Sequence, residues 1–275
     1  MQIIEQNLVA KDPKRKSEDG IVITDDFIAV IDGSTSKTDR RYCLFKSNGR
    51  FAMQIIEKYI RKAPKGISCH DFCVGVTRQI RNHYKNKDIP RLTEHPEDRL
   101  TASAVIFSRL NRQIWMIGDC QCMVNGVYYD NYKPDEEGIA KKRVDLIRQG
   151  YSANSARQMI VPELIKSMTE GQNKYYSVID GFNIFMPGIK KIKASGEIIM
   201  ASDGYPFLKR TLADSEKLLQ THLHNDPQNI NEYIATKGLV DGNVSFDDRS
   251  YIRFYTDCDA ELYEEPYLKE NCQNH

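Results

Sequence analysis

A strand that stops on a carboxylate dominates this sequence. Residues 27–36 read FIAVIDGSTS, an apolar run that ends abruptly at Asp32-Gly33. The run is rich in β-branched residues, too short for a helix and bounded by glycine, which predicts a buried strand. Asp32 would then lie at the tip of that strand, at one end of a sheet. A second apolar run, 198–201, ends similarly at Asp203-Gly204.

An Asp-Gly pair is also an ordinary turn signal, so the pattern has a second interpretation. Taken singly, any such pair indicates a hairpin or turn rather than a site. What favours a site is the position of several acidic residues next to predicted strands: Glu18-Asp19 comes just before the first strand, and Asp247-Asp248 comes before the run 251–255. The chain has five Asp-Gly pairs, which begin at Asp19, Asp32, Asp180, Asp203 and Asp241.

Length and composition allow one large domain or two small ones. We favour a single domain over 1–275, with its core at about 17–256 and a C-terminal tail at 257–275. The 39 basic and 38 acidic side chains nearly cancel, without long blocks of one sign, which argues against nucleic-acid and membrane partners. The N-terminus lacks a basic region followed by an apolar one, so we expect a cytoplasmic protein. Seven cysteines indicate reduced thiols; a zinc site near Cys69 and Cys73 is the alternative.

The spacing of apolar residues changes along the chain between helical and strand periods. Helices are predicted over 51–60, 68–84, 135–150, 155–168, 207–223 and 228–237, with a loop over 86–99. Further strands are predicted over 101–110, 113–120, 121–124, 127–130, 175–179, 182–185, 198–201 and 251–255, with a hairpin turn at Asn125-Gly126. Because no regular βαβ alternation occurs, this order predicts an α+β fold of antiparallel sheets covered by helices.

The strand-end carboxylates suggest a chemistry. If Asp32, Asp203 and Asp247 gather at one end of the sheets with Glu18 nearby, their charges repel and cannot all be present without a cation. Carboxylate and carbonyl oxygens are ligands that magnesium and manganese prefer. Two such ions can share a hydroxide and clamp a phosphoryl group. The pattern therefore predicts a hydrolytic phosphatase.

At these residues the chain resembles the metal-dependent type 2C protein serine/threonine phosphatases (the PPM family), as a divergent, bacterial-like member. The resemblance runs from about Ser17 to Tyr255. The motifs that carry it are, in order, Glu18-Asp19, Asp32-Gly33, Thr101-Ala102, Gly118-Asp119, Asp130 to Pro134, Ala201 to Gly204 and Asp247 to Ser250.

The resemblance implies a four-layer α-β-β-α sandwich of two antiparallel sheets flanked by helix pairs. It implies that Asp32 bridges two divalent ions, Mn²⁺ or Mg²⁺, with the Gly33 carbonyl on one of them. Glu18 would hold that same ion, and Asp203 and Asp247 would hold the other.

Other residues enter through the same resemblance. Asp130 is similar to a carboxylate that helps to bind a third ion in some members, and Asp119 would fix a turn. Lys14, next to Arg15, falls where the family has a phosphate-binding arginine, although a lysine lacks the bidentate fork of an arginine.

The activity thus expected is metal-dependent hydrolysis of phosphoserine and phosphothreonine in phosphorylated protein substrates, with Asp32 and Lys14 as the catalytic residues. Two alternatives stay open. One is a pseudophosphatase that keeps the fold as a binding module without turnover, and the other is a phosphatase of a small phosphorylated metabolite. The source of the proton for the leaving group is also open.

Overall fold

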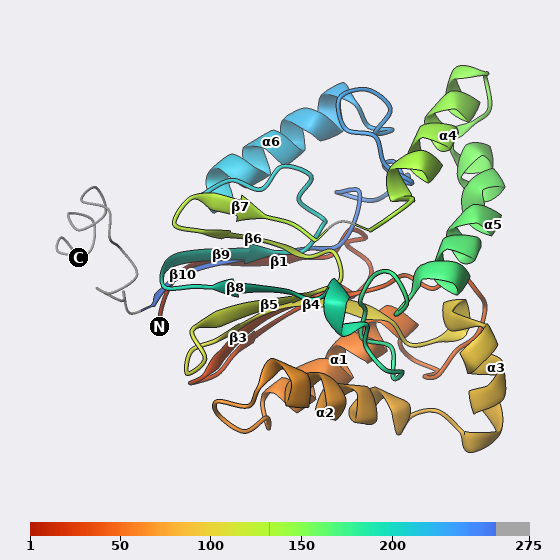
Figure 1. Cartoon of the computed structure of the whole chain (residues 1–275). Coiled ribbons are helices and arrows are strands. Elements are labelled where there is room, and N and C mark those ends of the chain that lie inside the picture. The colour runs from red at the N-terminus through yellow and green to blue at the C-terminus, as the bar shows by residue number, and fades with distance from the viewer. Residues whose placement is uncertain (132, 257–275) are drawn as a thin grey trace.

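Two five-stranded antiparallel sheets packed face to face form the centre of the protein (Figure 1). The structure is a computed structural model that describes residues 1–131 and 133–256. Tyr132, inside the motif from Asp130 to Pro134, and the expected tail 257–275 lie outside the described residues.

Each sheet mixes strands from distant parts of the chain. The first has the order β2 (Gly20–Ile23), β3 (Phe27–Gly33), β4 (Ala102–Ser108), β5 (Gln113–Ile117) and β8 (Lys190–Lys193). The second has the order β1 (Gln2–Val9), β10 (Arg249–Thr256), β9 (Gly196–Ala201), β6 (Gln121–Val124) and β7 (Val127–Tyr129).

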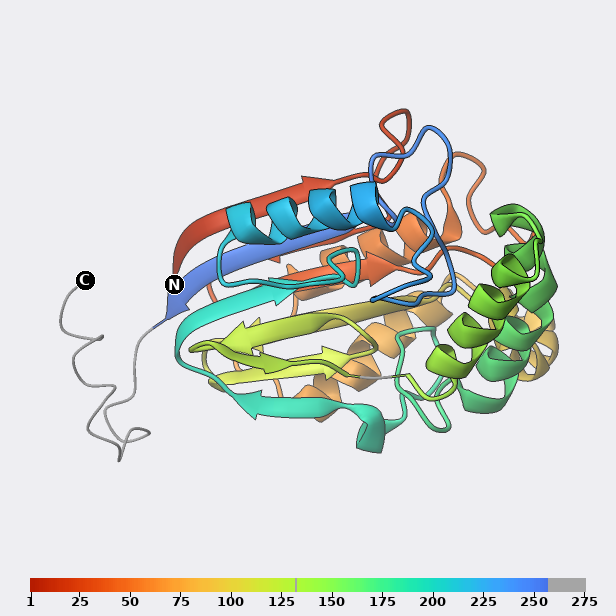
Figure 2. The ribbon, with the colours of Figure 1, turned by 90° about the horizontal axis from the view of Figure 1, so that it is seen from above.

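Helices cover the outer faces and one end of the sandwich (Figures 1 and 2). The pair α1 (Asn48–Ile60) and α2 (Cys69–Arg81) covers the first sheet, and α6 (Leu212–Asn225) covers the second. The hairpin of α4 (Glu136–Arg148) and α5 (Ala153–Gly171) stands at one end. Short helices are α3 (Ile89–Glu94) and the 3₁₀ turns η1 (Asn86–Asp88), η2 (Pro96–Asp98) and η3 (Met186–Gly188). None of the helices described has both the length and the apolar character to cross a membrane.

The core lies in layers because the central strands are buried on both faces. On β3, Ile28 and Val30 point into the space between the sheets, where they join Phe107 and Phe254. The alternate residues face α1 and α2. The spacing of apolar residues along β3 thus matches its packing. The predicted α+β class with antiparallel sheets is confirmed.

Local signals place several element ends as predicted. The Ser68 hydroxyl caps α2 by accepting a hydrogen bond from the Asp71 amide, which satisfies one of the amides that a helix start leaves free. Asn125 and Gly126 both have positive φ, at 49° and 84°, as the tight turn between β6 and β7 requires. Cys69 and Cys73 are buried free thiols in α2.

The predicted helix over 228–237 is wrong, because side chains capture its backbone groups. The Asp226 carboxylate accepts hydrogen bonds from the amides of Ile230 and Asn231. Asn229 has a positive φ of 52°, and the Nδ2 of its side chain donates a hydrogen bond to the backbone carbonyl of Lys237. Such local bonds compete with the helical pattern. The segment is therefore a loop, which passes beside the cavity described below.

The predicted strands over 175–179 and 182–185 are also absent, apart from isolated bridges at Tyr176 and Ile179. Asn173 holds this segment in another shape, since its carboxamide oxygen accepts from the amides of Val178 and Phe185. Conversely, β1, β8 and α3 occur where no element was predicted. β1 alternates half-buried with exposed residues at the sheet edge.

Candidate active site

The carboxylates selected in the sequence lie at one end of the sandwich. Asp32 is near the end of β3 and Asp203 follows β9, whereas Glu18 precedes β2 and Asp247 precedes β10. Because neighbouring strands are antiparallel, the end of one strand meets the start of the next at the same edge. A cavity of about 570 Å³ opens there, lined by Asp32, Gly33, Asp203 and Asp247.

Glycines allow the backbones around this cavity to approach closely. A Cβ on Gly33 would lie 2.3 Å from the Gly49 carbonyl oxygen and 2.7 Å from that of Glu18. A Cβ on Gly204 would lie 2.1 Å from the Asp248 carbonyl oxygen. No side chain fits at either position. The glycines of both Asp-Gly pairs are thus required by packing, which brings the loops that carry the carboxylates together.

Asp32 and Asp203 face the cavity without hydrogen-bond donors among the residues that the structure describes. One carboxylate oxygen of Asp203 is fully buried and has no partner. Burial, and then the charges of Asp203 and Asp19, raise the pKa of Asp32 well above its usual value. A buried carboxylate without donors is costly unless it is protonated or bound to a cation.

Asp19 adds a further buried carboxyl group behind these two. Its Oδ2 accepts a hydrogen bond of 2.9 Å from the Ser250 hydroxyl, whereas its Oδ1 is buried without a partner. Burial, together with the charges of Asp248 and Asp203, raises the pKa of Asp19 to about 7. The site therefore holds more carboxyl groups than its own donors satisfy.

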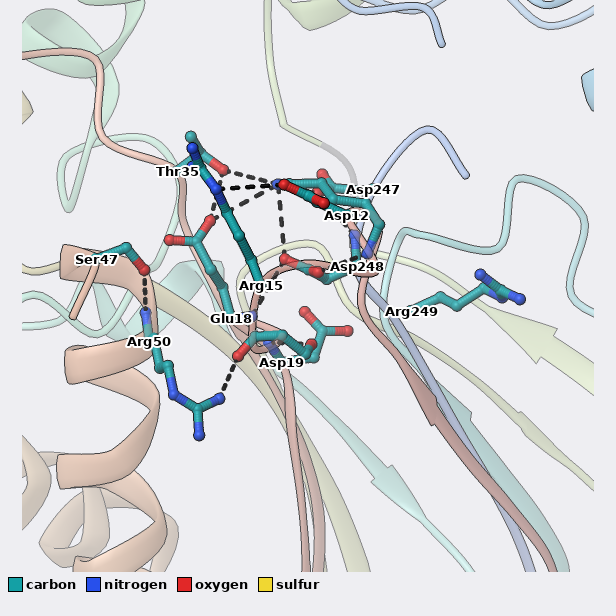
Figure 3. Close-up of polar contacts among 12 residues, drawn as sticks. Asp12, Arg15, Glu18, Asp19, Thr35, Ser47, Arg50, Asp247, Asp248 and Arg249 are labelled. Atoms are coloured by element: carbon teal, nitrogen blue, oxygen red, sulfur yellow. Dashed lines mark hydrogen bonds and ion pairs between the residues drawn. The ribbon is translucent and has the colours of Figure 1, made fainter. Parts of the chain in front are cut away.

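Lys11 brings a positive charge to the edge of this cluster. Glu18, Asp247 and Asp248 lie together there (Figure 3). Its Nζ is 2.7 Å from an Asp247 oxygen and 3.1 Å from the Thr35 hydroxyl. The oxygens of Glu18 and Asp248 are 3.7 and 3.6 Å away. The other oxygen of Asp247 pairs with Lys237. Asp247 is thus neutralised by two lysines from within the chain.

Asp119 lines the same cavity between β5 and β6. Burial would raise its pKa, but the ammonium of Lys133 and the hydroxyl of Ser103 hold the pKa below its usual value. This carboxylate therefore has donors of its own. These donors come from β4 and from the segment after β7, so the turn-fixing role of Asp119 stays a prediction.

Two residues named from the resemblance lie away from this cluster. Lys14 is exposed and does not line the cavity; its backbone amide donates to Asp12. Asp130 is exposed and borders an adjoining cavity of about 310 Å³, which shares Asp119 and Asp203 with the larger one. The cations that line the larger cavity are Lys11, Lys37, Lys133, Arg143, Arg157 and Lys237. Lys133 lies inside the motif from Asp130 to Pro134, and Arg143 lies in the helix that follows it, but neither was assigned a role at the site from the sequence. The other four belong to no motif by which they could have been found.

The donor set of the cavity fits a hard divalent cation. Carboxylate oxygens are the preferred ligands of Mg²⁺ and Mn²⁺, and Asp19 and Asp203 each have a buried oxygen without a hydrogen-bond partner. Over residues 1–131 and 133–256, no group of three or more acidic, histidine or cysteine side chains stands ready as a metal site. Instead lysines lie on Asp247 and Asp119, so metal binding requires side chains to rearrange.

Comparison with known proteins gives distant structural likeness. The sequence matches no established family profile and no curated protein. Among solved structures, the serine/threonine phosphatase PstP/Ppp of Mycobacterium tuberculosis is 13% identical, with a TM-score of 0.47 over 94% of this chain and 100% of that one. The catalytic domain of PstP with two manganese ions gives 12% identity and 0.45, over the same shares of the two chains. The phosphatase Stp1 of Staphylococcus aureus gives 14% and 0.44, over 94% of this chain and 96% of its own.

Proposed function

We propose that this protein is a phosphatase that depends on Mn²⁺ or Mg²⁺ and hydrolyses phosphoserine and phosphothreonine in proteins. The observation that carries the proposal is the pair Asp32 and Asp203, which face one cavity without hydrogen-bond donors among the described residues. Such a pair is stabilised either by protonation or by bound cations, and divalent ions in an open cavity suit phosphoryl transfer to water. The order of motifs in the sequence supports the same activity.

The proposed roles follow from position. Asp32 would contact both ions, with the Gly33 carbonyl and Glu18 on one side and Asp203 and Asp247 on the other. When bound, such ions supply charge neutralisation and a water of lowered pKa. Asp19 lies behind this set and would orient water through its unpartnered oxygen.

Further roles rest on the resemblance and on the adjoining cavity. Asp130 is the candidate ligand for a third ion at that smaller cavity. The resemblance implies that Lys14 contacts the phosphate of the substrate. For this contact the loop 10–17 would have to move, so that the exposed side chain of Lys14 reaches the cavity.

The activity is tested with an aryl phosphate and a phosphothreonine peptide, each assayed with Mn²⁺ and with chelator. We expect turnover of both substrates with Mn²⁺ and none with chelator. Hydrolysis that persists in chelator would contradict the metal dependence. Binding of the phosphopeptide without turnover of either substrate would instead identify a pseudophosphatase.

Metal should also stabilise the folded protein. A ligand that binds only the native state adds about 2.7 kcal/mol at a hundredfold excess over its Kd, and here it also relieves the repulsion around Asp32. We therefore expect millimolar Mn²⁺ to raise the melting temperature by several degrees, and Asp32→Asn to melt above wild type in chelator. Calorimetry in the two buffers measures both effects; identical melting curves with and without Mn²⁺ would argue against the metal site.

Lys11→Gln is expected to tighten Mn²⁺ binding. The Lys11 ammonium competes for the Asp247 oxygen that a metal would take, so its removal should lower the Mn²⁺ concentration at half-maximal thermal shift by roughly two- to fivefold, the effect of one partly exposed ion pair. Titration calorimetry gives the same affinity without turnover. Lys16→Gln, an exposed lysine of the same loop, is the matched control. Weaker binding in Lys11→Gln would show that this lysine supports the site rather than competing in it.

A further inference from the structure

The cavity is lined by positively charged side chains as well as by carboxylates. Lys37, Arg143 and Arg157 all line it. They come from three elements: the loop after β3, the middle of α4 and the first turns of α5. We refer to Lys37, Arg143 and Arg157 as the cationic wall.

No member of the cationic wall forms an ion pair with a carboxylate in the part of the chain that the structure describes. Lys37 donates to the carbonyl of Thr35 at 3.0 Å, and Arg157 donates to that of Thr236 at 2.7 Å. Lys11, Lys133 and Lys237, which also line the cavity, each pair with an aspartate. The cationic wall therefore holds the positive charge of the cavity that is not already neutralised by a side chain in contact.

The Arg143 guanidinium has more hydrogen-bond donors than the surrounding protein has acceptors for. Its side chain is 1% exposed. Its terminal nitrogens donate to the carbonyls of Gln228 and Ala235 and to the Gln228 side chain. Its Nε is buried without any partner. A buried N–H group without an acceptor is costly, so the guanidinium of Arg143 is only partly satisfied by the groups that surround it.

The three cations also repel one another. Burial, and then the charges of Arg157 and Lys237, lower the pKa of Lys37 to about 7. Burial and the charge of Arg157 also lower the pKa of Arg143, whereas the charge of Asp226 acts in the opposite direction. Glu136, which also lines the cavity, favours the charged form of Arg157 but forms no ion pair with it. An anion placed among these groups would be attracted by all three.

We propose that the cationic wall binds a second anionic group of the substrate, so that preferred substrates are phosphorylated segments with an acidic side chain beside the phosphoserine or phosphothreonine. This inference rests on the proposed function. The reacting phosphoryl group belongs beside Asp32 and Asp203. A cavity of about 570 Å³ is within the range that holds whole small ligands, so it has room for a neighbouring side chain. Arginine is suited to carboxylates because its fork can bond both oxygens.

The inference is tested with matched phosphothreonine peptides that carry Glu or Gln next to the phosphorylated residue. Wild type should show a kcat/KM roughly tenfold higher for the Glu peptides, the effect of one charge-assisted hydrogen bond. Lys37→Gln and Arg157→Gln should bring this ratio close to one. Arg157→Lys should keep part of it, because the charge remains but the fork that bonds both carboxylate oxygens is lost. Lys141→Gln, an exposed lysine of α4 that does not line the cavity, should keep the wild-type ratio.

A readout without turnover separates this inference from the proposed function. If no phosphate ester is hydrolysed, the proposed function fails, but fluorescence anisotropy still measures how tightly each peptide binds. Tighter binding of Glu peptides in wild type, lost in Lys37→Gln, would support the cationic wall. Equal kcat/KM and equal binding of Glu and Gln peptides, or a preference that survives in both Gln variants, would overturn it. If small bisphosphorylated esters were hydrolysed while neither the Glu nor the Gln peptide bound to the protein, the inference would also be overturned.

Discussion

Asp32→Asn is expected to reduce metal-dependent hydrolysis of an aryl phosphate to background. In the proposed site this carboxylate is the one shared by both ions. It faces the cavity, and no hydrogen-bond donor among the described residues stabilises its charge. An amide keeps the shape but offers one oxygen and no charge, so both ions lose a ligand together. Initial rates with saturating Mn²⁺ measure the loss; a variant within tenfold of wild type would contradict the two-ion assignment. Asp203→Asn and Asp247→Asn should behave similarly.

The matched control for this experiment is Asp241→Asn. Asp241 begins another Asp-Gly pair and is exposed. Asp241 itself does not line the cavity, although its neighbours Val240 and Asn243 do. Its kinetics should be those of wild type. If Asp241→Asn were as inactive as Asp32→Asn, the site would have been assigned to the wrong Asp-Gly pair.

Asp180→Asn is expected to lower the free energy of unfolding by about 3 kcal/mol, the effect of breaking a buried ion pair from one side. Asp180 is fully buried, and its carboxylate is 2.7 Å from the Arg99 guanidinium, which is 7% exposed. It also accepts from the Gln172 side chain and the Phe182 amide. The substitution leaves the Arg99 charge buried without its counter-ion.

Urea unfolding of wild type and Asp180→Asn measures this loss. Glu57→Gln is the matched control, because the pair of Glu57 and Arg61 has the same charges but is partly exposed to solvent; it should cost no more than about 1 kcal/mol. Since Asp180 does not line the cavity, the folded fraction of Asp180→Asn should keep its turnover. A stable variant would show that Arg99 finds another partner, whereas an inactive folded one would place Asp180 in the site.

The sequence alone was sufficient where local physics decides the outcome. Burial on both faces makes β3 an uninterrupted apolar run, and the Ser68 cap and the Asn125-Gly126 turn act within a few residues. Such signals place the ends of elements, and strand ends that carry Asp32 and Asp203 meet because the sheets are antiparallel. The class of the fold and the carboxylates of the cavity were therefore predictable.

The segments that were mispredicted are those in which side chains from elsewhere hold the backbone. Residues 228–237 have helix-compatible composition, but Asp226 and Asn229 bond their backbone groups, and Arg143 of α4 takes the Gln228 carbonyl. The edge strand β1 alternates exposed with half-buried residues and has no fully buried one. Its pairing with β10 joins the two ends of the described chain. No local pattern contains that information.

The charge balance of the cavity was decided by tertiary structure alone. Lys11 lies among three acidic side chains, and the cationic wall joins residues from a loop and two helices that are far apart in the chain. A single lysine or arginine in a polar segment looks the same whether it is solvated or buried in a cavity. Sequence could identify the carboxylates because strand ends mark them, but only the fold determines which cations face them, since charge interactions depend on distance in space and on burial.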